Sequence, residues 1–105
     1  MMATKSLTPR ERRIILECLK AAAEGPFFPD WEVDTLLGFS RNELKSLIAR
    51  WDTLDLNEAS VQQAINNCLI NLLGHPHGHH EEWSRYISVD PDELSALWES
   101  WRAQA

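Results

Sequence analysis

The sequence predicts an all-α fold, a compact single-domain bundle of about five helices in which one pair has the spacing of a helix-turn-helix. Three observations lead to this prediction. Apolar residues recur at intervals of three and four along most of the chain, as on the buried face of a helix. Capping residues precede these segments, and glycine or proline often follows them. The one strand-like stretch, residues 86–89, is too short to make a sheet.

Length and composition agree with a single domain. The chain has 105 residues, of which 44% are hydrophobic and 25% are charged, and such a composition is globular. We expect residues 1–105 to form one helical domain, with about the first seven residues flexible. No window is apolar enough to span a bilayer, and the start lacks a signal-type apolar stretch, so we expect a cytoplasmic protein without membrane contact.

The first predicted helix covers residues 9–23. Thr8 can cap it, Pro9 suits the first helical position, and Glu11 completes a capping box. Gly25 and Pro26 end the helix. Its buried stripe is predicted to contain Ile14, Ile15, Cys18, Leu19 and Ala22.

Two shorter helices are predicted next, over residues 31–37 and 41–51. Asp30 can cap the first, Gly38 can end it in the left-handed conformation, and Ser40 begins a second capping box. Apolar residues surround the Gly38 turn at the spacing of a helix-turn-helix. The sequence thus predicts a helix pair of that kind.

A DNA-binding role for this pair would use Ser40, Arg41 and Lys45 as contacts. Residues 31–51 carry no net charge, because three basic residues are matched by three acidic ones. Tight binders of duplex DNA commonly neutralise about 6 to 10 phosphates. We therefore keep a helix-turn-helix DNA-binding regulator only as an alternative function.

The longest periodic segment follows Asp55, which can cap a fourth helix that ends at Gly74. Its wide apolar face predicts a central helix with neighbours on more than one side. Asp90 and Pro91 then open the last helix. Its apolar stripe contains Leu94, Leu97, Trp98 and Trp101.

The fourth helix carries an unusual polar face, on which Gln63, Asn67, Asn71 and His75 follow one another at intervals of four. A solvated face would be filled more cheaply with Glu and Lys, so we expect these side chains to bind something. The favoured interpretation is that they hold loop backbone such as residues 27–30. The alternative is a polar groove for a peptide or a small ligand.

Aromatic side chains near the predicted loops form a candidate interaction surface. Tryptophan and other aromatic residues anchor many protein interfaces. Burial in the core is the competing interpretation, because Trp is highly buried on average. The candidate surface consists of Phe27, Phe28, Trp31, Trp83 and Tyr86.

A loop with four histidines, residues 75–80, precedes Glu81 and Glu82. Candidate ligands would be His77, His79, His80 and Glu81, but adjacent ligands on one loop do not match structural zinc sites, so we predict no metal. Cys18 and Cys68 lie far apart within apolar patterns, and we expect two buried, reduced thiols.

Catalytic motifs are missing from the sequence: it has no nucleophile elbow, no phosphate-binding glycine loop and no HExxH. We therefore expect no enzymatic activity and no cofactor. The net charge of −6 disfavours nucleic acid and favours a partner protein with a basic surface. The expected function is a small acidic protein-interaction module of unspecified oligomeric state, and a His-rich-loop metal-binding protein is the second alternative.

Two segments carry a resemblance to known proteins. Residues 25–32, GPFFPDWE, and residues 71–78, NLLGHPHG, together resemble small uncharacterised bacterial all-α proteins of unknown function and of about this length. The resemblance covers nearly the whole chain and implies a compact helical domain in a bacterial cytoplasm. It implies no activity and no functional residues.

Overall fold

A computed structural model describes residues 7–74 and 80–103 of the chain. All the regular structure in these ranges is helical, and residues 86–89 do not form a strand, so the predicted all-α class is confirmed. The elements are α1 (Pro9–Glu24), α2 (Asp30–Leu37), α3 (Arg41–Ala49), α4 (Ala59–Gly74), α5 (Trp83–Tyr86) and α6 (Pro91–Ala103), with the 3-10 turns η1 (Trp51–Thr53) and η2 (His80–Glu82).

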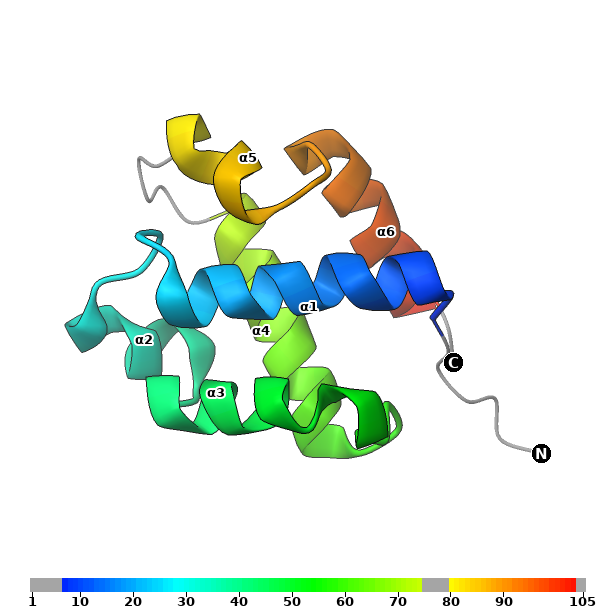
Figure 1. Ribbon diagram of the computed structural model, residues 1–105, viewed down its shortest axis with the longest axis horizontal. Coiled ribbons are helices and arrows are strands. Elements are labelled where there is room, and N and C mark those ends of the chain that lie inside the picture. The colour runs from blue at the N-terminus through cyan, green and yellow to red at the C-terminus, as the bar shows by residue number, and fades with distance from the viewer. Residues whose placement is uncertain (1–6, 75–79, 104–105) are drawn as a thin grey trace.

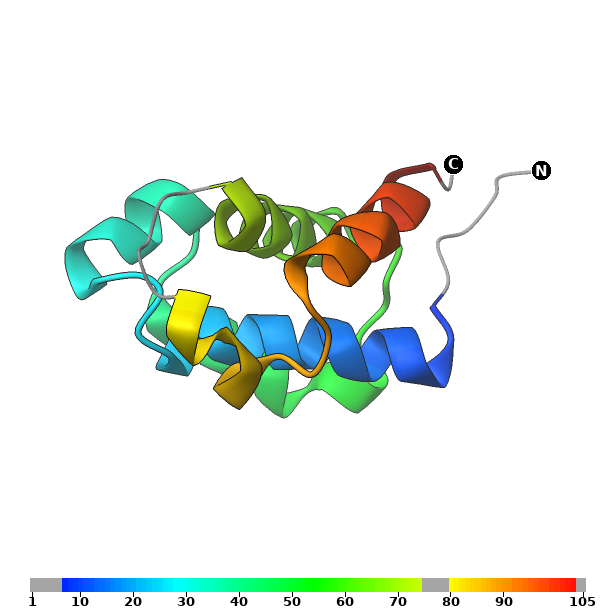
Figure 2. The same cartoon turned by 90° about the horizontal axis from the view of Figure 1, so that it is seen from above.

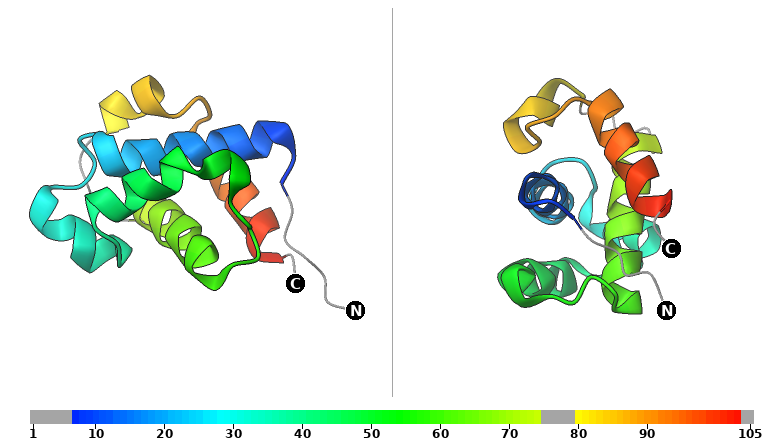
Figure 3. Two further views of the ribbon diagram at one scale, coloured as in Figure 1. Left: turned by 60° about the horizontal axis from the view of Figure 1, so that its bottom comes forward. Right: turned by 90° about the vertical axis from the view of Figure 1, so that its right-hand side faces the viewer.

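The helices form two layers. Figure 1 shows α1 crossing in front of α4, and the view from above in Figure 2 separates a layer of α1, α3 and α5 from a layer of α2, α4 and α6. The right-hand view of Figure 3 shows the same division. Helix α4 packs against α1, α2 and α6, while α1 packs against α3, α4 and α5. The centre of the bundle, predicted for the fourth helix, is therefore shared by α1 and α4.

Helix α1 begins and ends where the sequence predicts. The Thr8 hydroxyl accepts the Glu11 N–H at 3.1 Å, and the Glu11 carboxylate accepts the Thr8 N–H at 2.9 Å, which completes the capping box. At the other end, the Gly25 N–H donates to the Ala21 carbonyl. A Cβ at Gly25 would lie 2.6 Å from that carbonyl oxygen, so only glycine fits this close turn.

The turn between α2 and α3 also follows the prediction. Gly38 has φ 74°, the left-handed conformation that favours glycine, and Ser40 forms a capping box with Glu43. The predicted cap of α2 is wrong by one position. The helix begins at Asp30 itself, and Pro29 precedes it as a cap without a side-chain hydrogen bond.

The two later helices differ in how they start. Asp90 Oδ1 accepts the Glu93 N–H at 2.8 Å and so caps α6 as predicted. Asp55 instead accepts the Asn57 N–H at 2.9 Å within a turn, and α4 begins only at Ala59. The short helix α5 was not predicted, because four residues are too few for a periodic pattern.

The core runs between the two layers and contains most of the apolar stripes predicted for the helices, but Trp98 of the last stripe is only partly buried. Leu7, just before α1, also packs against this core. The largest fully buried side chains are Trp101, Phe27, Phe28, Ile15, Leu19, Leu37, Leu44, Ile65, Leu69, Leu72, Ile87 and Leu94.

Candidate functional site

The aromatic segment predicted as an interaction surface is mostly core. Phe27 and Phe28 are each 1% exposed and Trp83 is 5% exposed. The Phe27 ring meets the rings of Trp83 and Tyr86 edge to face, with centroids 6.0 and 5.6 Å away. These ring contacts join α5 to the segment that follows α1. The prediction of an exposed patch is wrong for Phe27, Phe28 and Trp83, because all three are buried. Tyr86 alone remains at the surface, 38% exposed.

The fifth residue of that predicted surface, Trp31, belongs to the first turn of α2. Its side chain lies outside what the structure describes. The interaction surface predicted from the sequence is therefore reduced to Tyr86 among the side chains that can be placed.

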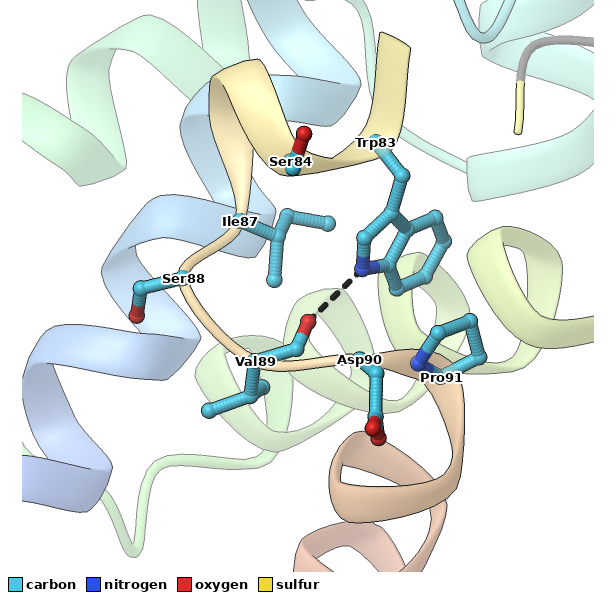
Figure 4. A pocket seen from close by; sticks show the side chains of 7 residues that line it. All are labelled: Trp83, Ser84, Ile87, Ser88, Val89, Asp90 and Pro91. Carbon is cyan, nitrogen blue, oxygen red and sulfur yellow. Dashed lines mark hydrogen bonds between the residues drawn. The ribbon is translucent and has the colours of Figure 1, made fainter. Parts of the chain in front are cut away.

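A hollow of about 320 Å³ lies beside this cluster, where α5 turns into α6 (Figure 4). The Trp83 indole N–H donates to the Val89 carbonyl at 2.7 Å across it. The hollow is lined by Trp83, Ser84, Ile87, Ser88, Val89, Asp90 and Pro91.

The polar groups of the hollow already serve the fold. Asp90 caps α6, and the Ser88 hydroxyl and N–H both donate to Glu17 Oε1, at 2.8 and 2.9 Å. Ser88 and Asp90 are therefore both bonded within the protein.

Amide side chains of α4 donate hydrogen bonds to backbone carbonyls. Asn67 donates to the Leu37 carbonyl at 2.9 Å, and Asn71 donates to the Asn67 carbonyl at 2.8 Å. Gln62 donates to the Leu56 carbonyl at 2.9 Å. The favoured interpretation, that these amides hold backbone outside α4, is supported by Asn67, which binds the end of α2, and by Gln62.

Of the candidate polar groove, the structure describes Gln63, Asn67 and Asn71. Asn67 and Asn71 are bonded within the bundle, and Gln63 is exposed on the outer side of α4. His75 lies outside the described residues. What remains on the surface of α4 is a helix side without charge.

Ile70 lies on that side and is 45% exposed, the higher of the two exposures recorded for large apolar side chains in the described part of the chain. Asn66, one turn before it, accepts the indole N–H groups of Trp98 and Trp101 at 3.3 and 3.1 Å. Trp98 is half-buried, and the Arg102 guanidinium lies 4.5 Å from its ring centroid. We name this surface, made of Gln63, Asn66, Ile70, Trp98 and Arg102, the α4–α6 face.

The residues predicted as DNA contacts are largely committed elsewhere. Arg41 donates from one guanidinium nitrogen to the Ala23 carbonyl and from another to the Phe28 carbonyl, both at 2.5 Å. Ser40 caps α3. Of the three candidates, only Lys45 is an exposed side chain that makes no recorded bond. The pair has helix-turn-helix connectivity, but its arginine serves to join α3 to the aromatic segment.

The candidate metal ligands fall mostly on residues that the structure does not describe. His77 and His79 lie outside the described ranges, and the side chain of His80 is likewise outside them. Glu81 is exposed in η2. Within residues 7–74 and 80–103, no three His, Cys, Asp or Glu side chains are grouped as metal ligands would be.

Both thiols are buried at the crossing of the two layers. Burial raises the pKa of Cys68 to about 12. Burial, followed by the nearby Cys68 and Glu17, raises the pKa of Cys18 well above its ordinary range. A nucleophilic cysteine requires the opposite shift, so these thiols belong to the core.

Comparison of the chain with models of protein families, with curated proteins and with solved structures gave no match. None of the helices in the described ranges has the length and hydropathy of a membrane span.

Proposed function

We propose that this protein is a non-enzymatic interaction module that binds a partner protein through the α4–α6 face. The observation that carries the proposal is the exposure of Ile70, 45%, on a helix of 16 residues that contains no charged side chain. Charged residues are depleted at the centre of protein interfaces. As part of the same proposal, and on the strength of the resemblance alone, we assign this module to a bacterial cytoplasm.

Other helices of the protein show what an ordinary solvated side looks like. The exposed positions of α1 include Arg13, Lys20 and Glu24, and those of α3 include Glu43 and Lys45. Such charged surfaces keep a helix soluble and discourage association. Helix α4 departs from this pattern while keeping an apolar side chain, Ile70, exposed on its outer side, which favours a surface that is covered by a partner.

The neighbouring part of α6 has the composition of a binding hot spot. Tryptophan and arginine are the side chains most enriched where interface energy concentrates. Trp98 is held by the Asn66 amide, and Arg102 stacks on its ring at 4.5 Å. Both side chains are thus oriented before binding, which lowers the side-chain conformational entropy that is lost when a partner binds.

The alternatives receive less support. DNA binding through α3 would require Arg41 to leave two backbone carbonyls that it holds. A metal-dependent role would depend on His77 and His79, which are outside the described residues.

A comparison of baits tests the proposal. Wild type, Ile70→Lys and Tyr86→Lys are each used to capture proteins from cells that express the chain naturally. We expect proteins retained by wild type and by Tyr86→Lys to be lost with Ile70→Lys, at an unchanged melting temperature, since Ile70 is exposed. If the captured proteins are lost only with Tyr86→Lys, the binding surface includes Tyr86 and the proposal is contradicted.

A further inference from the structure

The charge of the protein restricts which surfaces can meet in self-association. With a net charge of −6, two copies repel each other at long range. Contact through the region from η2 to the first turn of α6 would add to this repulsion, because exposed acidic residues such as Glu81, Asp90 and Asp92 would face their equivalents. The outer side of α4 avoids this conflict, because none of its 16 residues is charged.

The layer of α2, α4 and α6 has a geometry that suits a two-fold contact. The described elements leave α4 uncovered on the side away from α1, between α2 and α6 (Figures 2 and 3). This layer forms one of the broad sides of a molecule that extends 43 × 28 × 20 Å. A stable interface of standard size buries about 800 Å² per partner, and a side of these dimensions provides that area.

The side chains of the α4–α6 face are also self-complementary. In a two-fold dimer the same patch lies on both sides, so each group must fit a copy of itself or of a neighbour. Ile70 can pack on its equivalent, and the Gln63 amide offers both donors and an acceptor.

We propose that the partner bound by the α4–α6 face is a second copy of this chain, in a two-fold dimer with Ile70 near the axis. This inference rests on the proposed function and names its partner. Because each copy carries a net charge of −6, added salt screens the long-range repulsion between the copies and strengthens the dimer.

Sedimentation equilibrium of the purified full chain over a wide concentration range tests the proposal. We expect a monomer–dimer equilibrium for wild type and for Tyr86→Lys. For Ile70→Lys and for Ile70→Glu, each studied alone, we expect the dissociation constant to rise by at least about tenfold, because like charges meet near the axis. Mixing the two variants should restore a dimer, since Lys then faces Glu.

Other results would overturn this inference. A monomer at every concentration of wild type excludes the dimer, and a dimer that survives both Ile70 substitutions places the contact elsewhere. The bait comparison is a separate measurement: a different protein that is captured by monomeric wild type and lost with Ile70→Lys would uphold the proposed function while removing the second copy.

Discussion

The indole nitrogen of Trp101 lies 3.1 Å from Oδ1 of Asn66 and donates a hydrogen bond that joins the end of α6 to the middle of α4. The same oxygen accepts the indole N–H of Trp98 at 3.3 Å. Trp101 is 0% exposed, so its bond is shielded from water. One amide therefore fixes how the last helix lies on the bundle and positions Trp98 within the α4–α6 face.

Replacing Asn66 with Ala removes the acceptor that the two indoles share. We expect the free energy of unfolding to fall by about 1–3 kcal/mol, because a buried N–H loses its partner. Urea denaturation followed by circular dichroism measures the change. The exposed Gln63 on the same helix provides the control, and Gln63→Ala should stay within about 0.5 kcal/mol of wild type. Equal losses in the two variants would contradict the role given to Asn66.

Arg41 joins the first turn of α3 to the Ala23 and Phe28 carbonyls. Arg41→Lys keeps the charge but loses the planar fork that reaches two acceptors at once. We expect a loss of about 1–3 kcal/mol in the free energy of unfolding, the range for hydrogen bonds made by charged groups. Lys45→Ala, at an exposed position of the same helix, should change it by no more than about 0.5 kcal/mol. If Arg41→Lys is as stable as wild type, the two hydrogen bonds of Arg41 contribute nothing to the free energy of unfolding.

Substitution of Phe28 tests whether this side chain belongs to the core or to an interface. Because the ring is 1% exposed, we expect Phe28→Ala to lower the free energy of unfolding by about 3–5 kcal/mol. Thermal melting detects a loss of this size readily. The partly exposed Tyr86, changed to Ala, should cost less. An unchanged melting temperature for Phe28→Ala would restore the aromatic segment as a surface.

Stability should decline at alkaline pH because of the buried thiols. Burial raises the pKa of Cys68 from 9.0 to about 12, so between these values the folded state keeps a proton that the unfolded state loses. The stabilisation is complete below pH 9 and is lost as the pH rises toward 12. Urea denaturation at several alkaline pH values should show a shallower decline for Cys68→Ala. Parallel curves for the variant and wild type would contradict this linkage.

Local signals predicted the helices well. Thr8, Ser40 and Asp90 each cap the helix that follows them, because a capping box or an N-cap needs only residues within one turn. The same locality explains the misses. Asp55 prefers to close a turn onto Asn57, a competing bond available to any Asp in such a segment.

The surface was harder to predict, because burial depends on residues that are distant in the sequence. Phe27 is buried by Trp83 and Tyr86, which approach only when α5 folds over the end of α1. The role of Arg41 had one signal in the sequence. A basic side chain in the first turn of a helix is disfavoured by the helix dipole, so its presence there indicates that it donates hydrogen bonds to acceptors outside its own helix. The exposure of Ile70 had a signal, because Ile70 follows Gln63 by seven residues and Asn66 by four, and helical periodicity therefore places it on the polar side of α4.

The measurement that tests the central claim most directly is site-specific photo-crosslinking in cells that express the protein. A photoreactive phenylalanine derivative placed at Ile70 should yield a discrete crosslinked product, whereas the same group at the exposed Lys45 of α3, in the other layer, should yield none. That result would identify the α4–α6 face as a bound surface, and the mass of the product would show whether the partner is a second copy. An absence of product at Ile70, with a discrete product at Lys45, would contradict the account and return attention to the helix-turn-helix pair.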